Sequence, residues 1–307
     1  MALHPAAAKM IADSKISGRP NAHLLPVEQA RANFESDFGG LAKPDIAEAR
    51  DVQIQVRDGS IRGRLYRPTT QGVLPLVVYL HGGGWLLGSI DSHDAITRKL
   101  AIASGCAVLS VDYRRGPDRR FPTAVHDTVD SIAWARANAE QLQIDPDRVA
   151  VAGDSAGGNL ATAACLVLRD SDEALPLMQV LAYPVTTCDL DAGFDMTWEG
   201  HILYRDEMQW HQDNYLESAD QTQDPLVAPA LAQLRGLPPA LILMAECDPI
   251  RPQGVIYADA LRAAGVSVEV YDAPTLVHGY FGLDELFPEA EQAMELAGAR
   301  LAAVLLP

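Results

Sequence analysis

The sequence predicts an α/β protein with a mostly parallel, eight-stranded sheet flanked by helices. After Pro75, short apolar runs alternate with amphipathic stretches of helical periodicity. Continuous apolar strands separated by helices are typical of a parallel sheet that is buried on both faces. Before Pro75, two segments of alternating polarity meet at Asp58-Gly59, a dipeptide that favours a tight hairpin. The chain has 307 residues, of which 48% are hydrophobic, so it can bury a large core.

The elements follow in order from these patterns. Residues 5–13 and 26–38 have helical periodicity, and Gly39-Gly40 ends the second helix. The hairpin strands are expected at 52–57 and 61–66. The remaining six strands are expected at 76–80, 107–111, 149–152, 178–182, 241–245 and 266–271. The helices between and after them are expected at 95–104, 124–139, 157–168, 255–264 and 289–305.

Residues 189–230 interrupt the alternation of strands and helices. This segment has no strand pattern and carries Trp198, Tyr204 and Trp210, although only a short connection would be expected between two strands. We expect it to be an inserted helical cap, to which the helices of residues 1–45 also contribute. The core would then consist of residues 46–188 and 231–307. The alternative is a surface helix whose aromatic side chains anchor it to the core.

Charge and composition exclude several classes of protein. The formal charge is −17, whereas nucleic-acid binding requires clustered Lys and Arg, so no nucleic-acid partner is expected. No run reaches the roughly 18 apolar residues of a membrane helix, and residues 1–15 lack the pattern of a secretory signal. We therefore expect a cytoplasmic protein without a membrane partner. The four cysteines have no metal-type spacing, and neither a metal nor a cofactor is expected.

The segment Gly153-Asp154-Ser155-Ala156-Gly157 follows a predicted buried strand and precedes a helix. It fits the Gly-x-Ser-x-Gly nucleophile elbow, a strained turn that exposes a serine hydroxyl above the sheet. Serine is a poor nucleophile near neutral pH and requires a base and a group that orients the base. The segment therefore predicts Ser155 as a nucleophile with partners elsewhere in the chain.

The general base is expected to be a histidine after Ser155, because elbows of this type are followed first by their acid and then by their histidine. Three histidines meet this condition, and two of them, His201 and His211, fall in the predicted cap. His278 follows the last predicted strand, and Gly279 permits a tight loop there. We assign His278 as the base. The alternative is a solvated loop histidine.

The acid of the triad is expected directly after a strand. Asp248 ends an apolar run and precedes Pro249, which directs the chain out of the strand. Glu246 would share its face and is the second candidate. Asp272 also follows a strand, but it lies so close to His278 in the sequence that a local turn is its expected role.

A second glycine-rich segment, His81-Gly82-Gly83-Gly84-Trp85, follows the first parallel strand. The N–H groups of Gly83 and Gly84, together with that of Ala156, are the expected oxyanion hole, since preorganised N–H donors stabilise a developing negative charge. His81 is expected to brace this loop. A phosphate loop is the alternative for consecutive glycines, but neither known nucleotide motif fits the segment.

On the basis of these motifs, the sequence resembles the hormone-sensitive-lipase-like branch of the α/β-hydrolases, also called bacterial family IV esterases. The resemblance spans residues 52–307. It rests on the two glycine-rich segments, on Asp112-Tyr113-Arg114 with Pro117 and Phe121-Pro122, on Asp248-Pro249-Ile250-Arg251, and on His278-Gly279-Tyr280. The family would imply a serine carboxylesterase acting on short to medium acyl chains, the triad and oxyanion donors named above, a cap and no cofactor. The chain departs from the usual family pattern at Gly116-Pro117-Asp118, at Pro252 and at Tyr280.

The expected substrate is a small-molecule ester, bound in an apolar pocket. We expect Trp85, Leu86, Trp198, Tyr204 and Trp210 to line that pocket, although packing in the core or cap is an alternative for each. A deacetylase or amidase would use the same triad, and a non-catalytic receptor or a dehydratase could use the same fold. A homodimer is expected if strand 266–271 is an exposed sheet edge.

Overall fold

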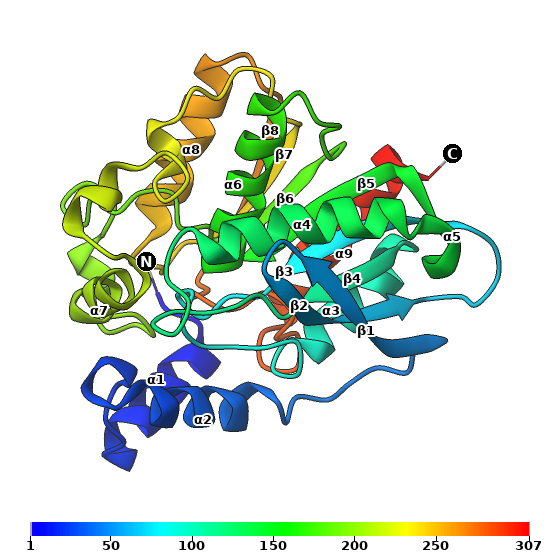
Figure 1. Ribbon diagram of the computed structural model, residues 1–307. Coiled ribbons are helices and arrows are strands. Elements are labelled where there is room, and N and C mark those ends of the chain that lie inside the picture. Colours follow the sequence, from blue (N-terminus) through cyan, green and yellow to red (C-terminus); the bar gives the residue numbers. More distant parts are fainter. Residues whose placement is uncertain (1, 307) are drawn as a thin grey trace.

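The computed structural model describes residues 2–306, which fold into an eight-stranded sheet between two layers of helices (Figure 1). The strands are β1 (Glu48–Val56), β2 (Gly59–Arg67), β3 (Leu74–Leu80), β4 (Ala107–Val111), β5 (Ile144–Asp154), β6 (Gln179–Ala182), β7 (Ala240–Ala245) and β8 (Val268–Ala273). They are arranged in the order β1-β2-β4-β3-β5-β6-β7-β8. The pairs β1–β2 and β2–β4 are antiparallel and all other pairs are parallel. The predicted fold class is confirmed.

The helices of the core cover both faces of the sheet. They are α3 (Asp94–Ser104), α4 (Thr123–Ala137), α5 (Ala139–Leu142), α6 (Ala156–Asp170), α8 (Arg251–Ala263) and α9 (Pro288–Leu305). Along β3, Val77 belongs to the same hydrophobic cluster as Leu301 of α9, whereas Val78 belongs to the cluster that contains Leu160 of α6. Because successive side chains of a strand point to opposite faces, the continuous apolar run of β3 is buried on both.

Several boundaries differ from the prediction, and two of the differences have a clear local reason. Strand β5 begins at Ile144, which pairs with Leu74, although the apolar run starts only at Val149. The polar residues 145–148 concealed this first part of the strand. The helix expected over 124–139 ends at Ala137, since Asn138 departs from helical geometry and its side-chain amide donates to the carbonyl of Trp134 (2.8 Å).

Two distant parts of the chain meet beside the sheet. Helices α1 (Pro5–Ser17) and α2 (Val27–Phe38), with the short 3₁₀ helix η1 (Ala22–Leu24), lie near α7 (Arg205–Tyr215) in Figure 1. The rings of His23 and Tyr204 are 6.3 Å apart, and Trp210 of α7 packs in one cluster with Leu25. Residues 189–230 contain α7, the 3₁₀ helices η2 (Met196–Trp198) and η3 (Ala219–Gln223), and the start of the 3₁₀ helix η4 (Pro229–Leu231). None of the eight strands falls in this segment.

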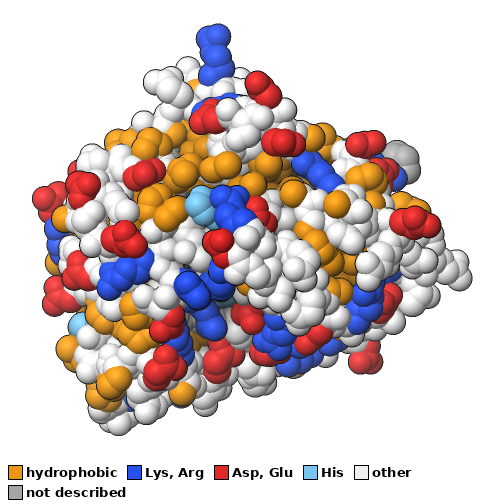
Figure 2. All heavy atoms as spheres, in the orientation of Figure 1, with side chains coloured by type: hydrophobic (Ala, Val, Ile, Leu, Met, Phe, Trp, Pro, Cys, Tyr) orange, Lys and Arg blue, Asp and Glu red, His pale blue; other side chains and the backbone are white. Residues whose placement is uncertain are grey.

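On the face shown in Figure 2, basic side chains lie beside acidic ones. An example of such pairing is Arg64, which donates to Asp51 and lies 2.9 Å from Asp91. Among residues 2–306, no helix is both long enough and apolar enough to cross a membrane.

Candidate functional site

Ser155 occupies a strained turn between β5 and α6. Its backbone has φ 54° and ψ −117°, a region that a residue with a Cβ rarely adopts. The turn is tight because a Cβ on Gly157 would lie 1.9 Å from the Leu80 carbonyl oxygen, and one on Gly153 would lie 2.4 Å from the Gly157 carbonyl carbon. Both positions therefore require glycine, as the motif predicts.

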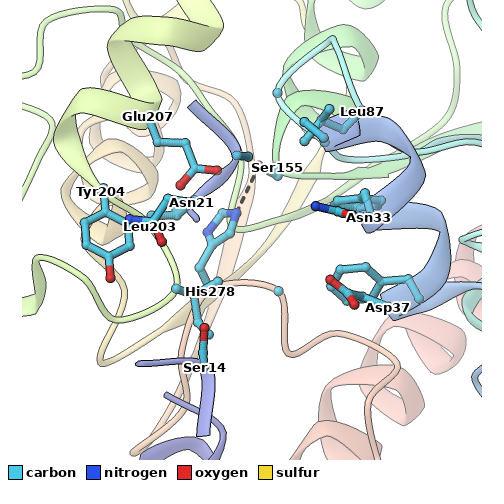
Figure 3. A pocket seen from close by; sticks show the side chains of 18 of the residues that line it. Ser14, Asn21, Asn33, Asp37, Leu87, Ser155, Leu203, Tyr204, Glu207 and His278 are labelled. Carbon is cyan, nitrogen blue, oxygen red and sulfur yellow. Dashed lines mark hydrogen bonds between the residues drawn. The ribbon is translucent and has the colours of Figure 1, made fainter. Parts of the chain in front are cut away.

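A chain of hydrogen bonds links Ser155 to two residues from the ends of β7 and β8. The Ser155 Oγ lies 3.0 Å from His278 Nε2, a contact drawn as the dashed line in Figure 3. His278 Nδ1 lies 2.7 Å from Asp248 Oδ2. The other carboxylate oxygen of Asp248 accepts from the N–H of Ile250 (2.9 Å), and the residue is fully buried. Nucleophile, base and acid candidates therefore stand within hydrogen-bonding distance of one another in the order that acyl transfer requires.

The other carboxylates considered for this position have different partners. Glu246 accepts a hydrogen bond from the N–H of Thr275 (2.8 Å), in the loop that leads to His278. Asp272 forms an ion pair with Arg251, so the expectation of a purely local turn was wrong. The side chains of both lie outside the chain of hydrogen bonds that ends at Ser155.

The glycine-rich loop after β3 approaches Ser155 from the neighbouring strand. Gly83 (φ 111°) and Gly84 (φ 59°) both have positive φ and line the same pocket as Ser155. Among the described backbone hydrogen bonds outside helices and strands, neither N–H has an acceptor. Ala156 is the first residue of α6, where helical N–H groups are also unsatisfied. For the three expected donors, the described hydrogen bonds outside helices and strands therefore contain no competing acceptor.

Asp154 connects this loop to the elbow, a role that the sequence analysis missed. Its Oδ1 accepts from the N–H of Gly82 (3.0 Å) and from the Tyr79 hydroxyl (2.7 Å). Burial raises the pKa of Asp154, but His93 and Tyr79 more than offset this, so the pKa lies below its usual value. The position of Asp154 between Gly153 and Ser155 in the motif was the one available signal.

His81 lies beneath the glycine-rich loop. It is fully buried, and its Nδ1 lies 2.8 Å from the Gly82 carbonyl oxygen. Its ring stacks on Tyr113, whose hydroxyl donates to the His81 carbonyl (2.8 Å). Burial holds the pKa of His81 well below its usual value, so the ring is neutral near pH 7. These contacts agree with the expected bracing role.

A pocket of about 690 Å³ opens onto Ser155 and His278. Its walls come from α1, α2, α7 and the glycine-rich loop, and Figure 3 shows Asn33 and Asp37 of α2 facing Tyr204 and Glu207 across it. This volume falls within the usual range for small-molecule sites. Other parts of the chain complete the wall beside Ser155, among them Ile96 of α3 and Leu283.

Only two of the five residues expected in the pocket wall line it. Trp85 and Tyr204 do, whereas Leu86, Trp198 and Trp210 do not, and for these three the prediction was wrong. Leu86 is fully buried in a cluster against which Trp210 packs. Trp198 packs edge-on against His201. These three side chains pack against other parts of the protein, which agrees with the alternative of packing in the core or cap.

The sequence analysis also missed Glu207 and His211, two polar residues of α7 that line the pocket. The Glu207 side chain is 12% exposed, and burial raises its pKa to about 7, although the interaction with His278 acts in the opposite direction. Burial lowers the pKa of His211 to about 3, so that ring is neutral at pH 7. His211 follows no strand, so the rule that triad partners follow strand ends assigns it no role. Its place on the pocket-facing side of a cap helix could not be derived from that rule.

The raised pKa of Glu207 predicts a pH-dependent effect of Glu207→Gln on stability. Because the folded-state pKa exceeds the usual glutamate value of about 4.5, this residue makes the protein less stable as the pH rises from about 4.5 to 7. A rise to about 7 corresponds to about 3 kcal/mol, since one pKa unit equals about 1.4 kcal/mol. We expect the variant to be more stable than the wild type at pH 8.5 by up to this amount and equally stable at pH 4. Urea unfolding at both pH values measures this, and a difference independent of pH would contradict it.

Comparison with known proteins agrees with this geometry. Residues 77–282 match a family described as having the alpha/beta hydrolase fold. Carboxylesterase NlhH of Mycobacterium tuberculosis is 42% identical over 232 residues, which cover 74% of this chain and 72% of that protein. An ethyl acetate hydrolase of Pseudomonas putida is 36% identical and covers 89% of this chain and 88% of its own length.

A solved structure extends the likeness over nearly the whole chain. The hyperthermophilic esterase from Pyrobaculum calidifontis is 33% identical, has a TM-score of 0.92 and covers 99% of both chains. Together with the matched family, these relatives assign the fold and the class. The chain belongs to the hormone-sensitive-lipase-like carboxylesterases of the α/β-hydrolase fold, a family of carboxylic ester hydrolases.

Proposed function

We propose that this protein is a serine carboxylesterase that hydrolyses short- to medium-chain acyl esters through Ser155, His278 and Asp248. The observation that carries the proposal is the continuous contact from Ser155 Oγ to His278 Nε2 (3.0 Å) and from His278 Nδ1 to Asp248 Oδ2 (2.7 Å). The free N–H groups of Gly83, Gly84 and Ala156 support it, because they supply donors for the oxyanion.

The reaction would proceed in two acyl-transfer steps. His278 Nε2 takes the hydroxyl proton as Ser155 Oγ attacks the ester carbonyl carbon, and the carbonyl oxygen becomes the oxyanion held by the three N–H groups. The tetrahedral intermediate collapses, the bond to the alcohol oxygen breaks, and His278 gives its proton to that oxygen. Water then attacks the acyl-enzyme with His278 again as base, which releases the acid and restores Ser155. Asp248 would hold the tautomer of His278 and stabilise its protonated form.

We further propose that residues 1–45 and 189–230 together form the cap over this site. The support is that α1 and α2 contribute one part of the pocket wall and α7 another. Leu25 and Trp210, one from each segment, also pack in the same cluster. Such a cap would shape the space available to the substrate.

Turnover of p-nitrophenyl esters from acetate to laurate tests the proposal. We expect the highest kcat/KM on short to medium acyl chains and a decline toward laurate, because the pocket has a finite volume of about 690 Å³. A parallel assay on acetanilide distinguishes an esterase from a deacetylase or amidase. If folded wild-type protein hydrolysed none of these esters, a receptor or dehydratase on the same fold would become the better interpretation.

We also propose that the protein forms a homodimer through the sheet edge. The support is that β8 pairs only with β7 in the described sheet, so its other side carries free backbone groups. Light scattering would give twice the chain mass of 33.1 kDa for a dimer. A mass equal to that of one chain would contradict the dimer.

A further inference from the structure

Glu207 is an acidic residue of the pocket wall that has no role in the proposed mechanism. It extends from α7 toward the side of the pocket that holds His278 (Figure 3). Its side chain is 12% exposed, and no hydrogen bond to its carboxylate occurs among the described residues. The Glu207 oxygens are not among the fully buried side-chain atoms, so they are accessible from the pocket to a ligand group that can donate to them.

No basic side chain of the pocket neutralises Glu207. The wall contains Lys15 and Arg19, but both are exposed and Arg19 donates to Asp37 (2.8 Å). His278 is the one group among the described residues whose interaction lowers the pKa of Glu207, and burial outweighs it. The carboxylate therefore faces the catalytic histidine without a permanent counter-charge.

His211 places Glu207 next to the oxyanion loop. Its Nε2 lies 4.0 Å from Glu207 Oε1, and its ring covers Gly84 so closely that a Cβ there would lie 2.2 Å from His211 Nδ1. The residue is 5% exposed, and its Nδ1 has no hydrogen-bond partner within residues 2–306. Burial keeps this imidazole neutral, so it cannot supply the missing positive charge. One imidazole ring thus separates Glu207 from a proposed oxyanion donor.

We propose that Glu207 and His211 form the subsite for the alcohol part of the substrate, and that this subsite selects esters whose alcohol carries a protonated amine. We assign the subsite to the alcohol part because His278 must reach the leaving alcohol oxygen to protonate it. Glu207 faces His278 and is therefore on that side of the substrate. A protonated amine supplies both the positive charge and the N–H donor that Glu207 lacks. The inference rests on the proposed ester hydrolysis and adds a substrate class to it.

Three acetate esters of similar size test the subsite at pH 8, with turnover followed by acid release. Dimethylaminopropyl acetate carries the protonated amine, isohexyl acetate is its neutral isostere, and hydroxybutyl acetate carries a neutral donor. We expect the wild type to prefer the amine ester over its isostere in kcat/KM. Glu207→Gln should reduce that preference by about 10- to 100-fold, the range expected for loss of a charge-assisted hydrogen bond.

Asp206→Asn is the matched control, because it removes the same charge from an exposed neighbour on α7 that does not line the pocket. We expect it to retain the wild-type preference. Inhibition of the wild type by dimethylaminopropanol, and its weakening in Glu207→Gln, gives a second measurement that does not depend on turnover of the variant.

Each contrary outcome is distinct. An equal loss of activity on all three esters in Glu207→Gln would indicate action through His278 and would overturn the subsite. A preference for the hydroxyl ester that depends on Glu207 would overturn the assignment to amines. If Glu207→Gln retained the wild-type activity on all three esters, and with it the wild-type preference, both the subsite and its assignment to amines would be overturned. If the wild type hydrolysed no ester at all, the proposed function itself would fail.

Discussion

Replacing His278 with alanine should lower kcat for p-nitrophenyl butyrate by about 10⁴- to 10⁶-fold, as removal of a triad member does in other serine hydrolases. The reason is that Ser155 Oγ has its 3.0 Å contact with His278 Nε2 and would lose its proton acceptor. Ser155→Ala should have an effect of similar size. The double variant should be no worse than either single variant, because the two residues act as one unit.

His201→Ala is the control for the loss of a histidine. His201 also follows Ser155 in the sequence, but its Nδ1 contacts the Trp198 carbonyl (3.1 Å) and it does not line the pocket. We expect its kcat to remain within about threefold of the wild type, as for substitutions that do not touch the reacting groups. Thermal unfolding of each variant establishes that the protein is folded. A His278→Ala variant that is folded and still active would refute the assigned base.

Gly83→Ala should lower kcat by about 10²- to 10³-fold, the effect of losing one oxyanion donor. A Cβ at this position would lie 2.4 Å from the backbone oxygen of Leu87, and Gly83 has φ 111°. The loop must therefore move, and its N–H groups would move away from the oxyanion. Because the donors bind the transition state more strongly than the ester, kcat should fall much more than KM rises.

Gly59→Ala is the control for Gly83→Ala. It distinguishes the effect of backbone strain from the effect of displacing the oxyanion loop. Gly59 also has positive φ (132°), but nothing lies within 4 Å of its Cβ position, and it sits in the β1–β2 turn. We expect a modest loss of stability there, with kcat retained. A similar fall in kcat for both variants would show that general destabilisation, and not the oxyanion loop, causes the effect.

The sequence predicted the residues whose geometry is imposed by local sterics. Gly153 and Gly157 are needed because backbone atoms approach them closely, and this requirement is visible as a motif. Asp248 and His278 follow strand ends, and the carboxyl ends of parallel strands converge at one edge of the sheet. The triad candidates could therefore be selected by order and position alone.

The pocket wall could not be predicted in the same way. Leu86 and Leu87 are adjacent and chemically identical, yet only Leu87 lines the pocket, whereas Leu86 is fully buried. On α7, Trp210 packs inward while Glu207 and His211 face the pocket. Which side of a polar helix faces a site depends on contacts with α2 and η1, far away in the sequence.

The cytoplasmic location expected from composition stays a prediction.

Covalent labelling tests the central claim most directly. The wild type should be inactivated by a p-nitrophenyl phosphonate, and peptide mass spectrometry should locate one phosphonyl group on Ser155. His278→Ala should react far more slowly, since the serine hydroxyl loses its base. A phosphonyl group on a different residue, or full ester turnover without labelling of Ser155, would contradict the proposed nucleophile.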